Sequence, residues 1–448
     1  MEDDIECHVV ALYYIYTPRP IPGDSISSHM ECHRSLCTDL GLNGRVRVSS
    51  EGINGVLSGR RSALKVYEES LKKDLVRVLD FDGSTETEID LDVKYCQLRR
   101  DIPAKDQLFS SLSVKETREV VSLYESKNVK KDNRNRGKGR RRRQKCSPSK
   151  SDGQSGNPPS LGPTSPDDLD LDRYPPATHL TPQQWNAHLS GLAMNGGSDD
   201  VVLIDARNIY ESRVGHMAVP GVSTLLPNTR KFSSFPLAID AASKQLSGKK
   251  VYMYCTGGVR CERASAYLKA VSDSDRWKGD KPKEIYQLKG GIQRYLETYG
   301  TLEGAGDENT LEATSASLDT KEPVVNANNC LYKGRNFVFD QRRTDPLVGP
   351  DGPGRCLRCG VPHDDYDNGH APCEYLEARC CRCRVLLLVC NTCRRNVRSF
   401  GEDGAGQSNS DLLCGPGGKE CVDEGNVISV EVFVGSTAEV NEEKSTST

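Results

Sequence analysis

The sequence has no long hydrophobic run: its longest aliphatic stretch, from Val385 to Val389, is far too short to span a bilayer. A signal-peptide pattern is also missing, because the first residues, MEDDIECHVV, are acidic and contain neither a basic start nor an apolar core. Both absences argue against a membrane partner and against an oxidising compartment. We therefore expect a cytoplasmic protein whose cysteines are reduced.

An excess of charge of one sign is lacking too. The 448 residues carry a formal net charge of only -3, so the chain as a whole has no electrostatic attraction for nucleic acid. Any RNA contact must then be a local patch, and residues 127–145 contain eleven Lys or Arg and one acidic residue. This stretch is expected to bind tRNA non-specifically, to act as a nuclear localisation signal, or to stay solvated.

Motifs for redox cofactors are absent as well. We find no flavin or nicotinamide motif, and the eight histidines form no recognisable facial triad of two His and one carboxylate. We therefore expect no flavin, no nicotinamide and no iron oxygenase site. Any oxidation would need another source of oxidising power.

The chain is too long for one hydrophobic core, so several domains are expected. The sequence does not predict an oligomeric state. Residues 7–125 alternate strand-like and helical patterns and predict a small α+β domain. Residues 177–345 alternate strands such as VVLID with helices such as ERASAYLKAV, which favours a parallel α/β sheet. The other segments are expected to be a disordered linker, first basic and then acidic, at 126–176, a cysteine-rich module at 354–396 and a largely disordered tail at 397–448.

The segment VYMYCTGGVRCERASAYL carries the main chemical signal. A buried strand ends at Cys255, and a helix begins near Cys261 after a short turn. The turn consists of Thr256, Gly257, Gly258, Val259 and Arg260. Its backbone amides can curl toward the sulfur, and the helix dipole together with Arg260 would stabilise a thiolate. We predict that Cys255 ionises more readily than an ordinary thiol and is the reactive group.

The role of Cys261 is open at this point. The first turn of the helix places it near Cys255, but its side chain can either pack in the core or face the loop. If it faces the loop, it can resolve a sulfenic acid or persulfide on Cys255 by forming a disulfide.

Two families use such a loop, and its length separates them. Tyrosine-phosphatase-like enzymes need five residues between the nucleophile and the phosphate-gripping Arg, whereas four separate Cys255 from Arg260. The loop therefore resembles that of rhodanese domains, and the upstream segment VVLIDARNIYESRVGHM matches their Asp-x-Arg, Glu and Gly-His pattern. The matching residues are Asp205, Arg207, Glu211, Gly215 and His216. We expect Asp205 and Arg207 to support the site rather than to act as bases.

Further segments narrow the resemblance. CTGGVRCERASAYL, YQLKGGIQRY, FSSFP, FVFDQRR and the N-terminal VRVSSEGINGVLSG are similar to segments of the tRNA wobble-uridine hydroxylase family. The resemblance implies a ferredoxin-like or acylphosphatase-like domain before the rhodanese domain. It also implies hydroxylation of the wobble uridine at C5, with molecular oxygen as co-substrate and Cys255 and Cys261 as the reactive pair.

The partner implied by this resemblance is the tRNA anticodon arm. The N-terminal domain would then hold the arm, with Lys94, Arg99 and Arg100 as phosphate contacts; the alternative is that these cations form a solvated charged face.

Two other functions remain open. The same thiolate fits a sulfurtransferase that carries a persulfide on Cys255, and the folded parts would also suit a non-catalytic binding protein. The N-terminal domain and the CTGGVRCE extension favour the hydroxylase, because a simple sulfurtransferase needs neither.

The cysteine-rich module predicts structural zinc. Cys356 and Cys359, and again Cys390 and Cys393, have the CxxC spacing that lets two thiolates bind one tetrahedral zinc from a tight turn. A second site is expected to draw on Cys380 and Cys383, with Cys373 and Cys381, and His363 and His370 are further candidate ligands. The spacing does not tell which of these residues bind the metal. A loop-rich module with few large apolar residues would need such a metal to fold.

Overall fold

The computed structural model describes residues 8–78, 89–124, 162–303, 329–366, 378–380, 383, 385–394 and 429–435. Within these ranges the chain forms three sheets, of five, six and four strands. No helix in these ranges is both long enough and apolar enough to cross a membrane.

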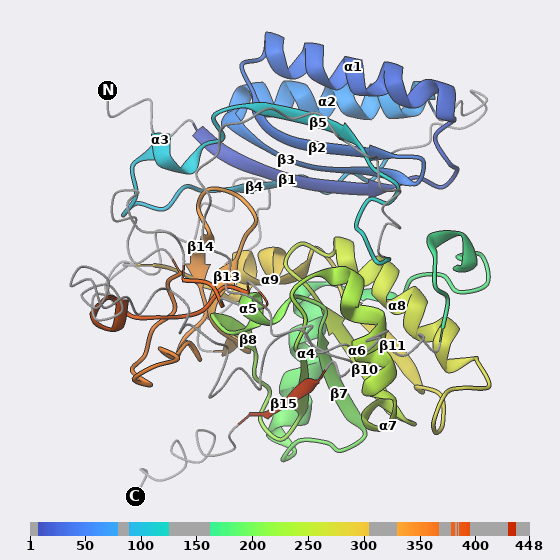
Figure 1. The fold of residues 1–448 in the computed structure, drawn as a ribbon, viewed down its shortest axis with the longest axis vertical. Coiled ribbons are helices and arrows are strands. Elements are labelled where there is room, and N and C mark those ends of the chain that lie inside the picture. The colour runs from blue at the N-terminus through green and yellow to red at the C-terminus, as the bar shows by residue number, and fades with distance from the viewer. Residues whose placement is uncertain are drawn as a thin grey trace, which may run out of the picture.

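The N-terminal unit is a five-stranded sheet with helices on one face (Figure 1). Its elements are β1 (His8–Tyr16), α1 (Gly23–Asp39), β2 (Asn43–Ser49), β3 (Gly52–Arg60), α2 (Arg61–Val78), β4 (Lys94–Cys96), α3 (Ala104–Gln107) and β5 (Leu112–Glu116). The strand order is β4-β1-β3-β2-β5, and only β2 and β5 pair in parallel. This is the small α+β domain that the sequence predicts.

The two faces of this sheet have different partners. Val9, Ala11 and Tyr13 of β1 are buried in one apolar cluster with residues of α1 and α2. Because successive side chains of a strand point to opposite faces, Tyr14 and Tyr16 lie on the other face. That face is turned toward the rest of the molecule (Figure 1).

The second unit is a parallel sheet with helices on both faces. Its elements are β6 (Thr178–Leu180), α4 (Pro182–Met194), β7 (Val201–Asp205), α5 (Ile209–Ser212), β8 (Gly215–Met217), β9 (Ser223–Pro227), η2 (Phe232–Ser234), α6 (Phe235–Ala241), α7 (Ser243–Leu246), β10 (Lys250–Tyr254), α8 (Val259–Ser272), β11 (Glu284–Leu288) and α9 (Gly291–Tyr299). The sheet order is β15-β9-β7-β10-β11-β6, where β15 is Val430–Val434. All pairs are parallel except β15 with β9, which places a strand from the end of the chain at the sheet edge.

Local sequence explains why these elements form. The run VVLID becomes β7, and each of its residues is buried because helices cover both faces of a parallel sheet. Helix α4 begins after Thr181, whose hydroxyl accepts from the backbone of Gln184 while the Gln184 side chain accepts from the backbone of Thr181. The predicted alternation of strands and helices is confirmed.

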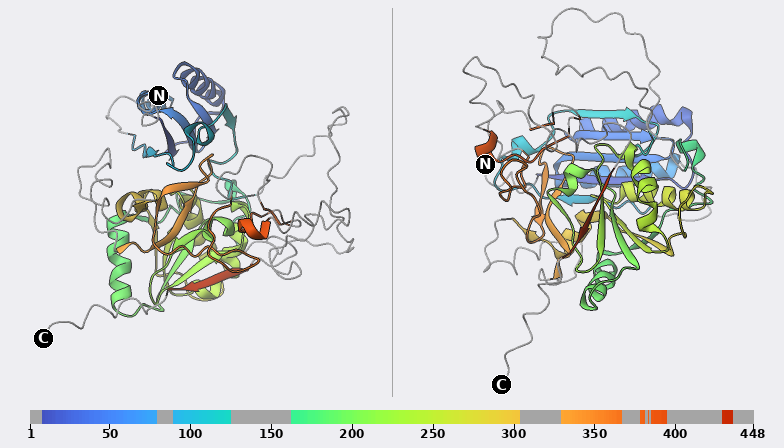
Figure 2. Two further views of the ribbon diagram at one scale, coloured as in Figure 1. Left: turned by 90° about the vertical axis from the view of Figure 1, so that its left-hand side faces the viewer. Right: turned by 60° about the horizontal axis from the view of Figure 1, so that its bottom comes forward.

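A third, smaller sheet joins the two units. It consists of β12 (Thr301–Leu302), β14 (Thr344–Val348), β13 (Tyr332–Phe337) and β8, in that order. Arg342, which precedes β14, donates to the backbone oxygen of Gln97 at 3.0 Å, and Arg99 donates to Thr344 at 2.7 Å. Figure 2 shows from two further directions that the N-terminal unit, in blue, lies against the remainder of the chain.

The stretch 162–176 differs from the predicted disordered linker. It contains the short helix η1 (Pro166–Asp168), after which Leu169 is 7% exposed and belongs to the apolar cluster that includes α8. Leu171 and Tyr174 pack against the same cluster. These three side chains bury enough apolar surface to order the stretch. Its mostly acidic composition gives no indication of this packing. The basic part of the linker lies outside the described residues.

Candidate active site

The candidate site is the turn between β10 and α8. Cys255 follows the last residue of β10, and α8 begins after Gly258, whose φ of 99° is a conformation that favours glycine. The amide of Gly258 donates to the Cys255 sulfur at 3.2 Å. The predicted curl of the turn around the sulfur is therefore present.

The start of α9 holds the turn in place. The amides of Ile292 and Gln293 donate to the carbonyl oxygens of Cys255 and Thr256, at 2.9 and 3.0 Å. With these two carbonyls bound to α9, the following amides of the turn are free to face the sulfur. A Cβ on Gly291 would lie 2.5 Å from the Cys255 oxygen, so only glycine permits this close approach.

Cys255 is fully buried and nevertheless acidic. Burial raises the pKa of Cys255, but the Cys261 thiol, the Arg260 guanidinium and the amides of residues 260 and 261 outweigh burial and lower it to about 6. The thiolate is therefore the predominant form at neutral pH, and the thiolate is the nucleophilic form of cysteine.

Cys261 faces the loop. It is 0% exposed, and its thiol lies close enough to the Cys255 sulfur to lower the pKa of Cys255. Burial, the adjacent Cys255 thiolate and the Glu262 carboxylate raise the pKa of Cys261 well above its usual range. The pair is thus one thiolate and one thiol in contact, which is the arrangement that a dithiol redox step requires.

Arg260 is held by a buried acid rather than left free. Its guanidinium makes two 2.7 Å hydrogen bonds to the carboxylate of Glu211, which is 0% exposed, and a third, of 2.9 Å, to the Thr256 hydroxyl. The Glu211 carboxylate also accepts from the backbone of Asn208 at 3.0 Å. Arg260 therefore contributes a fixed positive charge beside Cys255.

Asp205 and Arg207 lie beneath the site and bind each other. The Arg207 guanidinium donates to both carboxylate oxygens of Asp205, at 2.8 and 2.7 Å, and to the backbone oxygen of Gly215 at 2.6 Å. Both side chains are 0% exposed, so neither reaches a substrate. Their contacts are internal to the framework that carries the turn.

The N-terminal sheet covers the turn from the other side. The Tyr14 hydroxyl donates to Glu262 at 3.2 Å, and the Tyr16 hydroxyl donates to the backbone oxygen of Val259 at 3.3 Å. Arg263 pairs with Glu51 at 2.5 Å and lies 4.2 Å from the centre of the Tyr16 ring. The site is therefore at the junction of the two units, next to the segment EGING.

Two of the three predicted phosphate contacts are wrong. Lys94 is 1% exposed and pairs with Asp92 at 2.7 Å, and Arg99 is 7% exposed and bound to Asp101 and Thr344. Both cations are used inside the protein because the third sheet and α9 pack against this edge of the N-terminal sheet. Arg100 is exposed, and its phosphate contact stays a prediction.

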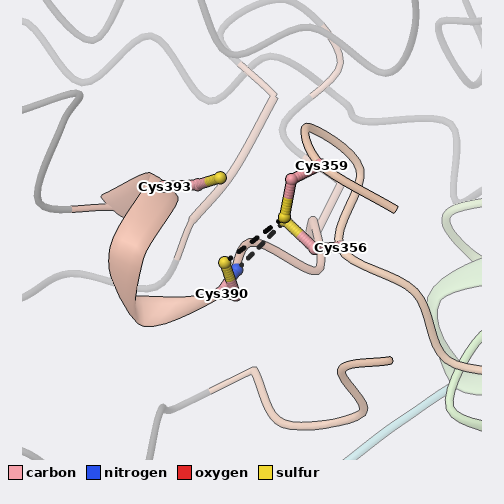
Figure 3. A group of neighbouring side chains, drawn as sticks. All are labelled: Cys356, Cys359, Cys390 and Cys393. Carbon is pink, nitrogen blue, oxygen red and sulfur yellow. Dashed lines mark hydrogen bonds between the residues drawn. The ribbon is translucent and has the colours of Figure 1, made fainter. Parts of the chain in front are cut away.

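The cysteine-rich module contains a second sulfur cluster. The sulfurs of Cys356, Cys359, Cys390 and Cys393 all lie within 4.8 Å of one another (Figure 3). Four thiolates around one zinc, with Zn–S of about 2.3 Å, would place their sulfurs about 3.8 Å apart. Cys359 and Cys390 already have sulfurs 3.7 Å apart. This group could hold a metal ion.

Cys380 and Cys383 do not join that cluster. They are buried in an apolar group with Ile209, Leu226 and Val385, against which Cys393 of the sulfur cluster also packs. Their expected partners Cys373 and Cys381 lie outside the described residues, so the second zinc site stays a prediction.

Comparisons with known proteins agree with this architecture. The family model of the UPF0176 acylphosphatase-like domain matches residues 8–120, and that of the rhodanese-like domain matches residues 191–298. A solved acylphosphatase from Coxiella burnetii aligns with 26% of this chain and 100% of its own at 14% identity, but its TM-score of 0.17 adds nothing to the assignment. The chain is thus a rhodanese-domain protein with an acylphosphatase-like N-terminal domain.

Relatives over most of the chain define the family. "Rhodanese-like domain-containing protein 6" of Arabidopsis thaliana is 30% identical over 88% of this chain, which spans only 52% of that longer relative. A phytoplasma protein named "tRNA uridine(34) hydroxylase", from the Aster yellows witches'-broom strain, is 30% identical over 66% of this chain and 70% of its own. A protein of the same name from Corynebacterium diphtheriae is 27% identical over 88% and 94%. The chain belongs to the tRNA uridine(34) hydroxylase family.

Several residues of the site are not identifiable from sequence reasoning. Glu211 matches the family pattern, but its position 49 residues before Arg260 gives no sign that the two side chains bind each other. The sequence around Tyr14 and Tyr16 predicts only a strand. No local pattern predicts which distant segment will pack against a face of that strand.

Proposed function

We propose that this protein hydroxylates the wobble uridine of tRNA at ring carbon C5. The observation that carries the proposal is the buried Cys255 thiolate, with the Cys261 thiol in contact, in a chain that belongs to a family named for this reaction. The N-terminal domain completes the enclosure of that thiolate, which a simple sulfurtransferase would not require.

The thiolate can activate the ring as a nucleophile. Addition of Cys255 sulfur to C6 breaks the C5–C6 double bond and makes C5 electron-rich toward molecular oxygen, the co-substrate that the family resemblance implies. One oxygen atom enters C5 and the other leaves as water. The C5 hydroperoxide transfers its outer oxygen to the Cys261 thiol, which becomes a sulfenic acid and leaves a hydroxyl on C5. Once the ring is released, the Cys255 thiolate attacks that sulfenic acid, which forms the disulfide and releases the oxygen as water. An external dithiol then reduces the disulfide.

The substrate base must first reach a closed site. Cys255 and Cys261 are both 0% exposed, and Tyr14 and Tyr16 lie across the turn. Polar contacts hold this cover in place, notably Glu51 with Arg263. Separation of these contacts would open the turn to a flipped-out base of the anticodon loop, since chemistry on a base requires its removal from the stack.

The partner is then the anticodon arm, and the proposed location is the cytoplasm. Arg100 is the exposed candidate for a phosphate contact, and residues 127–145 supply a basic stretch that favours RNA through counterion release. The alternative role of this stretch is nuclear targeting.

The sulfur cluster of the module is proposed to bind one structural zinc. Cys356, Cys359, Cys390 and Cys393 supply four thiolates and thereby a complete shell, which leaves no position for a substrate. The amide of Cys390 also donates to the Cys356 sulfur at 3.3 Å, the type of contact that orients a thiolate ligand.

The experiment is mass spectrometry of tRNA nucleosides from cells that lack the protein and are complemented with the wild type or with Cys255→Ser. We expect 5-hydroxyuridine derivatives only with the wild type. Equal amounts with both proteins would overturn the proposed role of Cys255.

The alternative function is sulfur transfer. The acidic Cys255 and its four-residue spacing to Arg260 also suit a persulfide carrier. Unchanged nucleosides in all strains, together with a persulfide detected on Cys255, would favour this alternative.

A further inference from the structure

A line of polar side chains leads from the cysteine loop to the surface. The Tyr14 hydroxyl donates to Oε1 of Glu262 at 3.2 Å, and Nε2 of His179 lies 2.8 Å from the same oxygen. Glu262 is on α8 directly after Cys261, His179 is on β6 of the second unit, and Tyr14 comes from β1 of the first. Three elements from two domains therefore converge on one carboxylate.

The inner end of this line is at the turn that holds the reactive sulfur. A Cβ on Gly258 would lie 2.7 Å from the Tyr14 hydroxyl, so that hydroxyl touches the turn that holds Cys255. Burial, the Glu262 carboxylate and the sulfurs of Cys255 and Cys261 raise the pKa of Tyr14 well above its ordinary value. Tyr14 is thus a neutral phenol that donates its proton toward Glu262.

The outer end is open to solvent. The Glu262 side chain is 10% exposed, whereas that of His179 is 42% exposed. The amide of Gln287 lies 3.1 Å from Oε2 of Glu262 and 2.7 Å from Nε2 of His179, and it fixes the two relative to each other. His179 is therefore the most exposed of the three residues.

We propose that Tyr14, Glu262 and His179 form a proton path that carries the C5 proton of the substrate uracil to solvent. This inference rests on the proposed hydroxylation, for which it supplies the final step.

The step balances without an oxidant. In the hydroxylated adduct, C5 carries the new hydroxyl and a hydrogen, and C6 carries the Cys255 sulfur. The C5–H bond breaks and its electron pair becomes the C5–C6 double bond, while the C6–S bond breaks and its pair returns to sulfur. The proton passes to the Tyr14 oxygen as the phenol proton moves to Glu262, and Glu262 passes its proton to His179 and so to water.

The test uses an isotope effect at the bond that breaks. The full-length protein and its Glu262→Gln, Tyr14→Phe and His179→Gln variants are given tRNA whose wobble uridine carries hydrogen or deuterium at C5. Loss of the path should slow hydroxylation by about a hundredfold for Glu262→Gln, and by less for the other two, as general acid–base groups usually contribute. The ratio of hydrogen to deuterium rates should rise about twofold or more above the wild-type ratio, because proton removal becomes rate-limiting.

Two control variants separate this role from packing. Tyr16→Phe removes a matched hydroxyl from the same strand, whose partner is a backbone oxygen, and should leave the isotope ratio at the wild-type value. His188→Gln changes a histidine that contacts Tyr252 instead, and should leave both rate and ratio unchanged. If Glu262→Gln does not fold, the half-exposed His179 gives the decisive variant.

The outcomes separate the proposed hydroxylation from the proposed proton path. Wild-type protein without product would overturn the hydroxylase function and the path with it. Product from the wild type, with unchanged rates and isotope ratios in all three path variants, would overturn the path alone.

Discussion

The protein contains two groups of cysteines that differ in how their charge is arranged. In the loop, Cys255 and Cys261 are both fully buried, and a helix start and Arg260 stabilise one thiolate while the other sulfur stays a thiol. In the module, four sulfurs lie within 4.8 Å of one another, and three of them are partly or fully exposed.

This difference teaches that the surroundings of a cysteine decide its chemistry. One thiolate next to one thiol has an electron pair available for a substrate and a partner for oxidation. Four thiolates around one centre repel one another unless a cation neutralises them, so that arrangement selects a metal.

The largest expected effect concerns the module. Cys390→Ser should reduce zinc affinity by more than about a hundredfold, because Cys390 is a direct ligand. Removal of a residue that only contacts a ligand already reduces metal affinity by up to about a hundredfold. Metal analysis of the purified chain checks this, with Cys32→Ser on α1 as the control. A variant that retains its zinc after dialysis against a chelator would contradict the four-thiolate site.

The next effect concerns the loop and its pH dependence. Since the folded pKa of Cys255 is about 6, its thiolate is present above that pH and lost below it. At pH 7 Cys255 should carry roughly thirtyfold more thiolate than a cysteine with an ordinary pKa. The rate of alkylation of Cys255, followed by peptide mass spectrometry from pH 4 to about 9, should have its midpoint near pH 6. A midpoint in the ordinary range of thiols would contradict the claim that the loop stabilises a thiolate, which is what distinguishes it from the module.

A smaller effect isolates the contact between the two loop sulfurs. Cys261→Ala removes the thiol that lowers the pKa of Cys255. The free energy of a hydrogen bond to a charged group corresponds to a pKa change of about one unit. We expect the midpoint of Cys255 alkylation to move upward by that amount. An unchanged midpoint would mean that Arg260 and the amides stabilise the thiolate without a contribution from Cys261.

The smallest effect concerns the cover of the loop, which the module lacks. Glu51→Gln removes the ion pair with Arg263, and a partly exposed pair contributes up to about 1 kcal/mol. Alkylation of Cys255 at a fixed pH should therefore become faster by up to about fivefold. Glu69→Gln on the exposed side of α2 should not change the rate; an equal increase there would point to general loosening.

Much of the fold follows from local sequence, whereas contacts between domains do not. The runs VVLID and VYMYC predict two buried strands, and Cys255 at the end of the second predicts the reactive turn. The burial of Lys94 and Arg99 depends on which distant surface meets their strand, and periodicity carries no information about that. For the same reason, Tyr14 and Glu262 are recognisable as neighbours only in the structure.

The two cysteine groups show the same limit. Spacing predicts that Cys356 and Cys359 share a cluster with Cys390 and Cys393, because CxxC pairs are local signals. The direction of the Cys261 side chain does not follow from spacing, because it depends on how α8 is rotated against the sheet. The packing of residues 162–176 is not predictable from composition, because the three apolar residues there are outnumbered by acidic ones.

The most direct test is hydroxylation of an unmodified tRNA by the purified protein under oxygen labelled with the heavy isotope. We expect wild-type protein and Cys32→Ser to place labelled oxygen on C5 of the wobble uridine, and Cys255→Ser to form no product. Labelled product from Cys255→Ser would contradict the central claim that the loop thiolate performs the chemistry.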